Sequence, residues 1–220
     1  MSQGSNLDPY EAASLPDPHQ GSFYRDLEAA VSGIPSRPGE GEIATWVLPY
    51  AVVLSQECDL EQDGHGRNEL LETLEQDKKA ENVDKLVPCV LVCPAWPAEQ
   101  FHEGQHMERF GLRVKRKTSA QYRTIRQNLD PRYHFLTSWR QLQVPASVID
   151  FKHFFTIPTS TLRAAYGSSE NYIALLTCPY REDLSQRFAA FLSRVGVPLQ
   201  HHSLDSAPAS DQPSEIPISN

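Results

Sequence analysis

The chain has 220 residues, a formal net charge of −8 and 40% hydrophobic residues, a composition that is ordinary for a soluble globular protein with a sizeable core. No apolar run reaches the roughly 18 residues that a membrane-spanning helix needs. Residues 1–22 have neither the basic start nor the apolar stretch of a secretory signal. We therefore expect a cytoplasmic protein that makes no contact with a membrane.

Composition shifts along the chain predict one domain between two disordered ends. Residues 1–21 are rich in Ser, Pro, Asp and Gly, and residues 199–220 are polar and rich in Ser and Pro. The segment 22–198 carries the apolar runs and is predicted to form the domain. Charged stretches at 56–85 and 94–132 interrupt those runs, and we interpret both as insertions.

Apolar periodicity predicts short strands that alternate with a few helices. Strands are expected at 42–47, 50–55, 86–93, 133–137, 147–157 and 172–178. Helices are expected at 22–31, 68–83, 159–166 and 179–195, with a polar loop at 61–67 and a helical turn within 94–104. Pro49 predicts a turn or a sheet edge between the first two strands. Strands separated by long insertions predict a mainly β fold with α additions, in which a small, strongly bent antiparallel barrel packs with the C-terminal helix.

The four cysteines do not form a recognisable metal or disulfide pattern. There is no Cys-x-x-Cys pair among Cys58, Cys89, Cys93 and Cys178, and the eight histidines are scattered. A zinc site needs a tight cluster of ligands. We therefore predict buried, reduced thiols, no metal site and no cofactor.

One strand ends in a run of polar groups. The apolar residues Tyr50 to Leu54 lead into Ser55-Gln56-Glu57-Cys58-Asp59, and strand ends often present polar groups to a cleft. A nucleophilic Cys58 would need a neighbouring cation, whereas the adjacent carboxylates disfavour a thiolate. Alternatively, Cys58 packs inward while the polar residues bind backbone at the strand end. We predict a ligand- or partner-binding edge made by Ser55, Gln56, Glu57 and Asp59.

A second candidate site lies in a basic segment. Residues 109–132 hold 8 of the 20 basic residues and only one acidic residue, Asp130. Cations interleaved with aromatic rings are typical of surfaces that bind single-stranded nucleic acid. The alternatives are an exposed insertion or a docking site for an acidic protein, and the overall negative charge weighs against nucleic acid. The candidate residues for RNA or an acidic partner are Arg113, Lys115, Arg116, Lys117, Tyr122, Arg123 and Arg126.

The order of the predicted elements resembles the MazF/PemK family of toxin ribonucleases. Residues 42–47 and 49–55 are similar to the paired opening strands of that family, 86–93 to its central strand, and 148–158 with 172–192 to its closing strands and C-terminal helix. The resemblance covers roughly 42–195 and implies an SH3-like barrel.

Two positions depart from the pattern of that family. Leu48 stands where those enzymes place an arginine, and Cys93-Pro94 stands where they place a threonine or serine. RNA cleavage needs a group that moves a proton and a donor that stabilises the developing charge. We therefore assign no catalytic residue.

Three functions remain open from the sequence. The first is a non-catalytic interaction or regulatory module of a bacterial stress-response or antiviral defence system, which acts by binding a protein partner. The second is an endoribonuclease toxin with a rearranged site, holding RNA on 109–132. The third is a cysteine-dependent hydrolase. A homo-oligomer is compatible with each.

Overall fold

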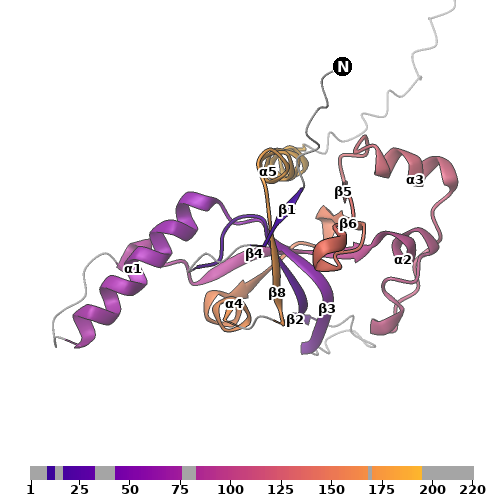
Figure 1. The fold of residues 1–220 in the computed structure, drawn as a ribbon. Helices are drawn as coiled ribbons and strands as arrows, with labels where there is room; N and C mark the ends of the chain where they lie inside the picture. Colours follow the sequence, from indigo (N-terminus) through magenta and orange to yellow (C-terminus); the bar gives the residue numbers. More distant parts are fainter. Residues whose placement is uncertain (1–8, 13–16, 33–42, 76–82, 168–169, 195–220) are drawn as a thin grey trace, which may run out of the picture.

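The computed structural model describes residues 9–12, 17–32, 43–75, 83–167 and 170–194. Within these ranges eight strands form an antiparallel sheet in the order β1-β8-β2-β3-β4-β6-β5, and β7 pairs with β4 beside β6 (Figure 1). The strands are β1 (Tyr10–Glu11), β2 (Ser22–Ser32), β3 (Ile43–Val53), β4 (Cys89–Pro97), β5 (Tyr133–Leu136), β6 (Ser147–Asp150), β7 (Phe155–Pro158) and β8 (Tyr172–Leu176).

Helices lie within the charged stretches 56–85 and 94–132, in the segment before β8 and on the C-terminal side of the domain. They are α1 (Glu57–Glu75), α2 (Ala98–Glu103), α3 (Ser119–Arg126), α4 (Thr159–Tyr166) and α5 (Tyr180–Leu192). Short 3-10 turns are η1 (Val83–Lys85), η2 (Glu108–Phe110), η3 (Arg140–Leu142) and η4 (Phe151–His153). The predicted mainly β fold with helical additions is confirmed. No described helix is long and apolar enough to cross a membrane.

The helix predicted at 22–31 is wrong, because these residues form strand β2. Its apolar positions fit a helical stripe, but from Leu27 to Ala30 buried and exposed residues alternate as in a strand. β2 pairs with β3 along most of its length and with β8 at its start. Pairing on both sides outweighs the local helical spacing.

Pro49 does not end a strand as predicted, since β3 continues through it. The ladder between β2 and β3 pairs Arg25 with Tyr50 and Leu27 with Leu48, and it skips the pair between them. Pro49 has no N–H to contribute there, and Asp26 opposite adopts a left-handed φ of 50°. One local irregularity therefore replaces the expected turn.

Two other boundaries differ from the prediction. Strand β4 continues through Pro94 to Pro97, and α2 begins at Ala98. The strand predicted at 147–157 is divided into β6 and β7, because the Asp150 carboxylate accepts a hydrogen bond from the Lys152 N–H and begins the turn η4. The helices α4 and α5 lie where the sequence predicts them.

Helix α1 begins much earlier than predicted and includes the supposed loop at 61–67. Gly64 is buried, and a Cβ at this position would lie 2.9 Å from an oxygen of the Asp17 carboxylate. The glycine therefore permits a close approach of residue 17 to the helix. Of the predicted helix 68–83, residues 76–82 lie outside the described residues, and Val83 belongs to the 3-10 turn η1.

Parts of the predicted N-terminal arm belong to the fold. Tyr10 is 1% exposed, and β1 pairs with β8. Residues 17–21 run beside α1, and the Gly21 N–H donates to the Val53 carbonyl at 3.0 Å. Residues 1–8 and 13–16 of the arm and the predicted tail at 199–220 lie outside the described residues.

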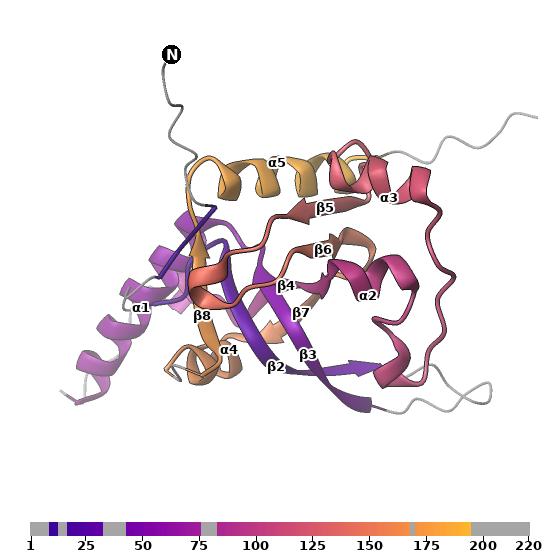
Figure 2. The ribbon, with the colours of Figure 1, turned by 45° about the vertical axis from the view of Figure 1, so that its right-hand side comes forward.

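Both faces of the sheet are buried, each against its own hydrophobic core. Consecutive residues of a strand point to opposite faces and therefore belong to different cores. One core contains Tyr24, Leu48, Val92, Trp96, Phe101 and Ile125. The other contains Phe23, Val52, Cys93, Ile149, Phe151, Leu184 and Phe188. Helix α5 covers the second core, whereas α2 and α3 lie at one side of the sheet and α1 at the opposite side (Figures 1 and 2). The two candidate sites are therefore far apart.

Candidate functional site

The polar run after β3 forms the junction between the strand and α1. Ser55 is structural, since its Oγ accepts a hydrogen bond from the Leu91 N–H at 2.8 Å. Glu57 is partly buried and contacts the Nδ1 atom of His19, and its Oε2 accepts from the Gln20 N–H at 2.7 Å. Gln56 and Asp59 are exposed. Of the four predicted binding residues, two therefore have structural partners and two face solvent.

Cys58 does not pack inward as expected. Its thiol is exposed and donates to Gln56 Oε1 at 3.8 Å and to Asp59 Oδ1 at 3.7 Å. Neither is a cation that would favour the thiolate. Cys89 and Cys178 are also exposed, so the prediction of buried thiols holds for Cys93 alone, while all four thiols are free.

The two positions that depart from the ribonuclease pattern are both in the core. Leu48 and Cys93 are each fully buried. The Cys93 thiol donates to the Asp150 carbonyl at 3.2 Å, and burial raises its pKa well above the usual value. Neither side chain reaches solvent, so neither can act on a bound substrate.

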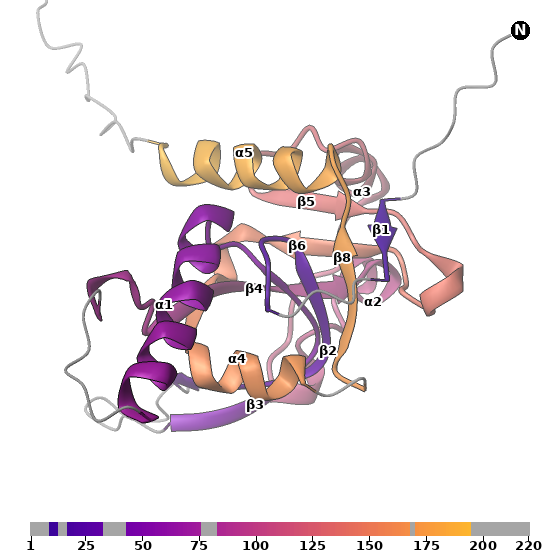
Figure 3. The same ribbon diagram turned by 60° about the vertical axis from the view of Figure 1, so that its left-hand side comes forward.

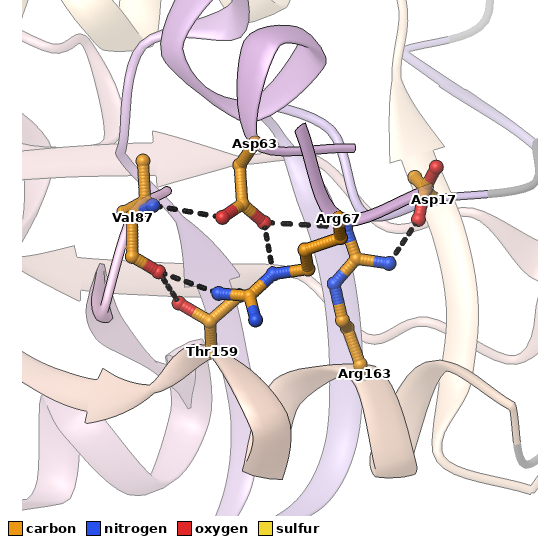
Figure 4. Close-up of polar contacts among 6 residues, drawn as sticks. All are labelled: Asp17, Asp63, Arg67, Val87, Thr159 and Arg163. Carbon is orange, nitrogen blue, oxygen red and sulfur yellow. Dashed lines mark hydrogen bonds and ion pairs between the residues drawn. The ribbon is translucent and has the colours of Figure 1, made fainter. Parts of the chain in front are cut away.

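A buried carboxylate attaches α1 to the body of the domain (Figure 4). Asp63 is 1% exposed, and it accepts hydrogen bonds from the Val87 N–H at 2.7 Å and from Arg67 Nε at 2.8 Å. Arg163 on α4 lies between Asp63, at 3.2 Å, and Asp17, to which it also donates. Thr159 and Arg67 both donate to the Val87 carbonyl. This network holds α1, α4 and residues 17–21 together (Figures 3 and 4).

The basic segment divides into an extended stretch and the helix α3. Thr118 and Gln121 form a reciprocal capping box that begins α3. Before the helix, Arg116 pairs with Glu103 at 3.0 Å, and Lys117 donates to the Tyr133 hydroxyl at 3.3 Å. Arg113 and Lys115 are exposed on the extended stretch. Tyr122, Arg123 and Arg126 lie on α3 itself.

Rings and cations alternate on the outer side of α3. Tyr122 stacks on His102 of α2, with ring centroids 4.3 Å apart, and partial burial raises the pKa of the Tyr122 phenol. The Arg126 guanidinium lies 5.7 Å from the centre of the Phe135 ring. Arg123 and Arg126 are exposed and form no ion pair with any described residue.

Three adjoining hollows surround this helix. One of about 400 Å³ is lined by His102, Ser119, Tyr122, Arg123, Arg126 and Gln127. Another of about 580 Å³ shares Tyr122 and Arg126 and reaches Glu99, Phe135 and Pro145. A further hollow of about 380 Å³ shares His102 and Ser119 and reaches Arg116 and Lys117. We call this surface the α3 basic surface, and define it by the residues that line the three hollows.

The α3 basic surface contains five of the seven predicted residues, Arg116, Lys117, Tyr122, Arg123 and Arg126. The sequence does not predict that His102 belongs to this surface, because His102 lies on α2, outside the basic segment. It also does not predict that His19 and Glu61 lie beside Glu57. The ligand atoms of His19, Glu57 and Glu61 lie within 4.8 Å of one another, a grouping that the scattered histidines of the sequence do not indicate.

Comparison of the chain with models of protein families finds no match, and comparison with curated protein sequences finds none either. The chemistry of the two surfaces is therefore the basis for assigning a function.

Proposed function

We propose that this chain is a binding module that holds single-stranded RNA on the α3 basic surface. The observation that carries the proposal is the row of three hollows around α3, lined by rings and by cations, of which Arg123 and Arg126 form no ion pair with any described residue. Single strands are bound by surfaces of this kind, because cations track the phosphates while rings stack on the bases.

The charges on this surface favour an anionic ligand despite the acidity of the whole chain. Glu103 is engaged by Arg116, and Glu99 is the carboxylate that lines the largest of the three hollows. Arg123 and Arg126 remain free to contact phosphates. Because few cations are involved, we expect modest affinity that falls with salt by about 0.7 log units per log unit of salt for each phosphate contacted.

The aromatic side chains favour RNA over an acidic protein. Tyr122 and Phe135 are only partly buried, and each lines a hollow next to Arg126. An unstacked base offers a flat face to such rings, and stacking contributes roughly 1–3 kcal/mol per base. A duplex hides those faces, so the proposal includes a preference for single strands.

Fluorescence anisotropy with labelled single-stranded RNA of mixed sequence tests the proposal. We expect the double substitution Arg123→Ala/Arg126→Ala to weaken binding by about tenfold or more, and Tyr122→Leu to weaken it by about fivefold or more. The matched control is Arg140→Ala, which removes an exposed arginine of η3 outside the three hollows. Equal binding by the double variant and the control would refute the proposal.

Two further outcomes identify the alternatives. RNA incubated with the protein is expected to remain full length; cleavage that disappears in the double variant would instead support an endoribonuclease. Capture of an acidic protein on the same arginines, without RNA binding, would support a protein-docking module. Membership of the MazF/PemK family and a role in bacterial stress response or defence stay predictions.

A further inference from the structure

Three potential ligands line one side of helix α1. Glu57, Glu61 and His65 follow one another at intervals of four residues, so they lie along one stripe of the helix. The segment 17–21 runs beside this stripe and adds His19. The ligand atoms of His19, Glu57 and Glu61 all lie within 4.8 Å of one another. An imidazole from one segment thus meets two carboxylates from another.

A hollow of about 420 Å³ opens beside these side chains. It is lined by Asp17, Pro18, His19, Leu60, Glu61, Gly64, His65 and Asn68. Glu61 and His65 are exposed on its rim, whereas Pro18 is buried. The hollow therefore provides space for an ion and its bound waters, with additional oxygen and nitrogen atoms close to the three ligands.

Surrounding hydrogen bonds hold the ligands in place. The Gln20 N–H donates to Glu57 Oε2, and the Gln20 side-chain amide donates to the Leu54 carbonyl at 3.3 Å and to Ser185 at 3.3 Å. Asp17 is held by Arg163. Such outer contacts orient metal ligands and leave them little freedom to lose on binding. Arg181 is a nearby cation, and its Nη1 lies 3.9 Å from Glu57 Oε1.

We propose that His19, Glu57 and Glu61 form a binding site for a divalent first-row transition metal ion. Mixed imidazole and carboxylate ligands suit Zn²⁺ and Mn²⁺, whereas Mg²⁺ and Ca²⁺ prefer sets made of oxygen alone. His65 and Asp17 are placed to contribute directly or through water. The site lies on the opposite side of the domain from α3 and does not depend on RNA binding (Figure 2).

Calorimetric titration of the chelator-treated full chain with Zn²⁺ and with Mn²⁺ tests the site. We expect one ion per chain, and at least about tenfold weaker binding in Glu61→Gln and in His19→Ala. Glu61 is exposed, so Glu61→Gln is expected to fold normally. The matched control is Glu72→Gln, another exposed α1 carboxylate that lies outside the cluster.

Cobalt spectra separate this site from the exposed cysteines. Co²⁺ bound by His19, Glu57 and Glu61 is expected to lack the charge-transfer absorption of a thiolate ligand. Loss of stoichiometric binding in Cys58→Ser, with unchanged binding in Glu61→Gln, would overturn the proposal. Failure of the untreated and chelator-treated chains to bind either ion at micromolar concentration would also overturn it, without affecting the result of the RNA experiment.

Discussion

Asp63→Ala is expected to lower the free energy of unfolding by about 3 kcal/mol, the lower end of the effect of removing one partner from a buried ion pair. The carboxylate is 1% exposed and serves Val87, Arg67 and Arg163 at once. Alanine leaves a backbone N–H unpaired and two guanidinium groups without their shared anion. We expect the lower end of this range of destabilisation because the Arg67 and Arg163 side chains are each 28% exposed and regain some hydration when the carboxylate is removed.

Urea unfolding followed by circular dichroism measures this change. Asp63→Asn retains an acceptor for the Val87 N–H but loses the charge, so we expect a smaller loss than for alanine. Glu72→Ala is the control on the same helix, and its effect should stay within about 0.5 kcal/mol because the side chain is exposed. A loss in Asp63→Ala no larger than in this control would show that the network does not attach α1 to the domain.

The Asp63 network also shows why the grouping of His19 with Glu57 and Glu61 could not be predicted from the sequence. Asp63 and Arg163 are 100 residues apart in the chain, and His19 and Glu57 are 38 apart. No spacing rule connects residues at such distances. Gly64, a residue type that is typical of loops, is instead the place where residue 17 approaches the helix closely. A local turn signal and a packing requirement look the same in a sequence.

The α3 basic surface was more predictable because its charges are contiguous. Arg116, Lys117, Arg123 and Arg126 fall within a short stretch, in which the first two precede the capping box of α3 and the last two lie on the helix. What the sequence could not indicate is His102, which α2 brings from outside the basic segment to stack on Tyr122. Local charge thus identified the surface, and tertiary packing completed it.

Some strands could likewise be predicted from the local sequence, whereas others depend on the tertiary fold. The apolar run at 172–178 predicts a strand, and β8 lies within it at Tyr172–Leu176. The apolar spacing of residues 22–31 predicts a helix, yet these residues form strand β2. Pairing with β3 and β8 favours the strand over the helix at 22–31, and the positions of those two strands depend on the whole fold.

The stability of the protein is expected to fall as the pH is lowered from about 7 to about 5, because histidines are buried in the neutral form. His134 on β5 is 2% exposed, and burial, with a smaller contribution from Arg187, lowers its pKa to about 3. Asp183 is the carboxylate nearest to its Nδ1, at 3.9 Å, and it is exposed. The unfolded chain has an ordinary histidine pKa of about 6.5.

The sign follows from counting protons. Between these two pKa values the unfolded chain binds a proton that the folded chain does not, so stability rises with pH in this range and is lost as pH falls. At about pH 5 the loss from His134 amounts to about 2 kcal/mol, since each pH unit below 6.5 contributes about 1.4 kcal/mol. Burial also lowers the pKa of His106 to about 4, and this histidine acts in the same direction.

Urea unfolding at several pH values separates the His134 contribution from the others. His134→Gln removes the titrating ring, so we expect this variant to lose about 2 kcal/mol less than the parent chain between about pH 7 and about pH 5. Phe135→Leu, on the same strand, changes packing without removing a titrating group and should keep the parent dependence on pH. Because the comparison uses differences between two pH values, a uniform destabilisation of His134→Gln cancels. Parallel pH curves for His134→Gln and the parent would therefore show that the buried ring accepts a proton in the folded state.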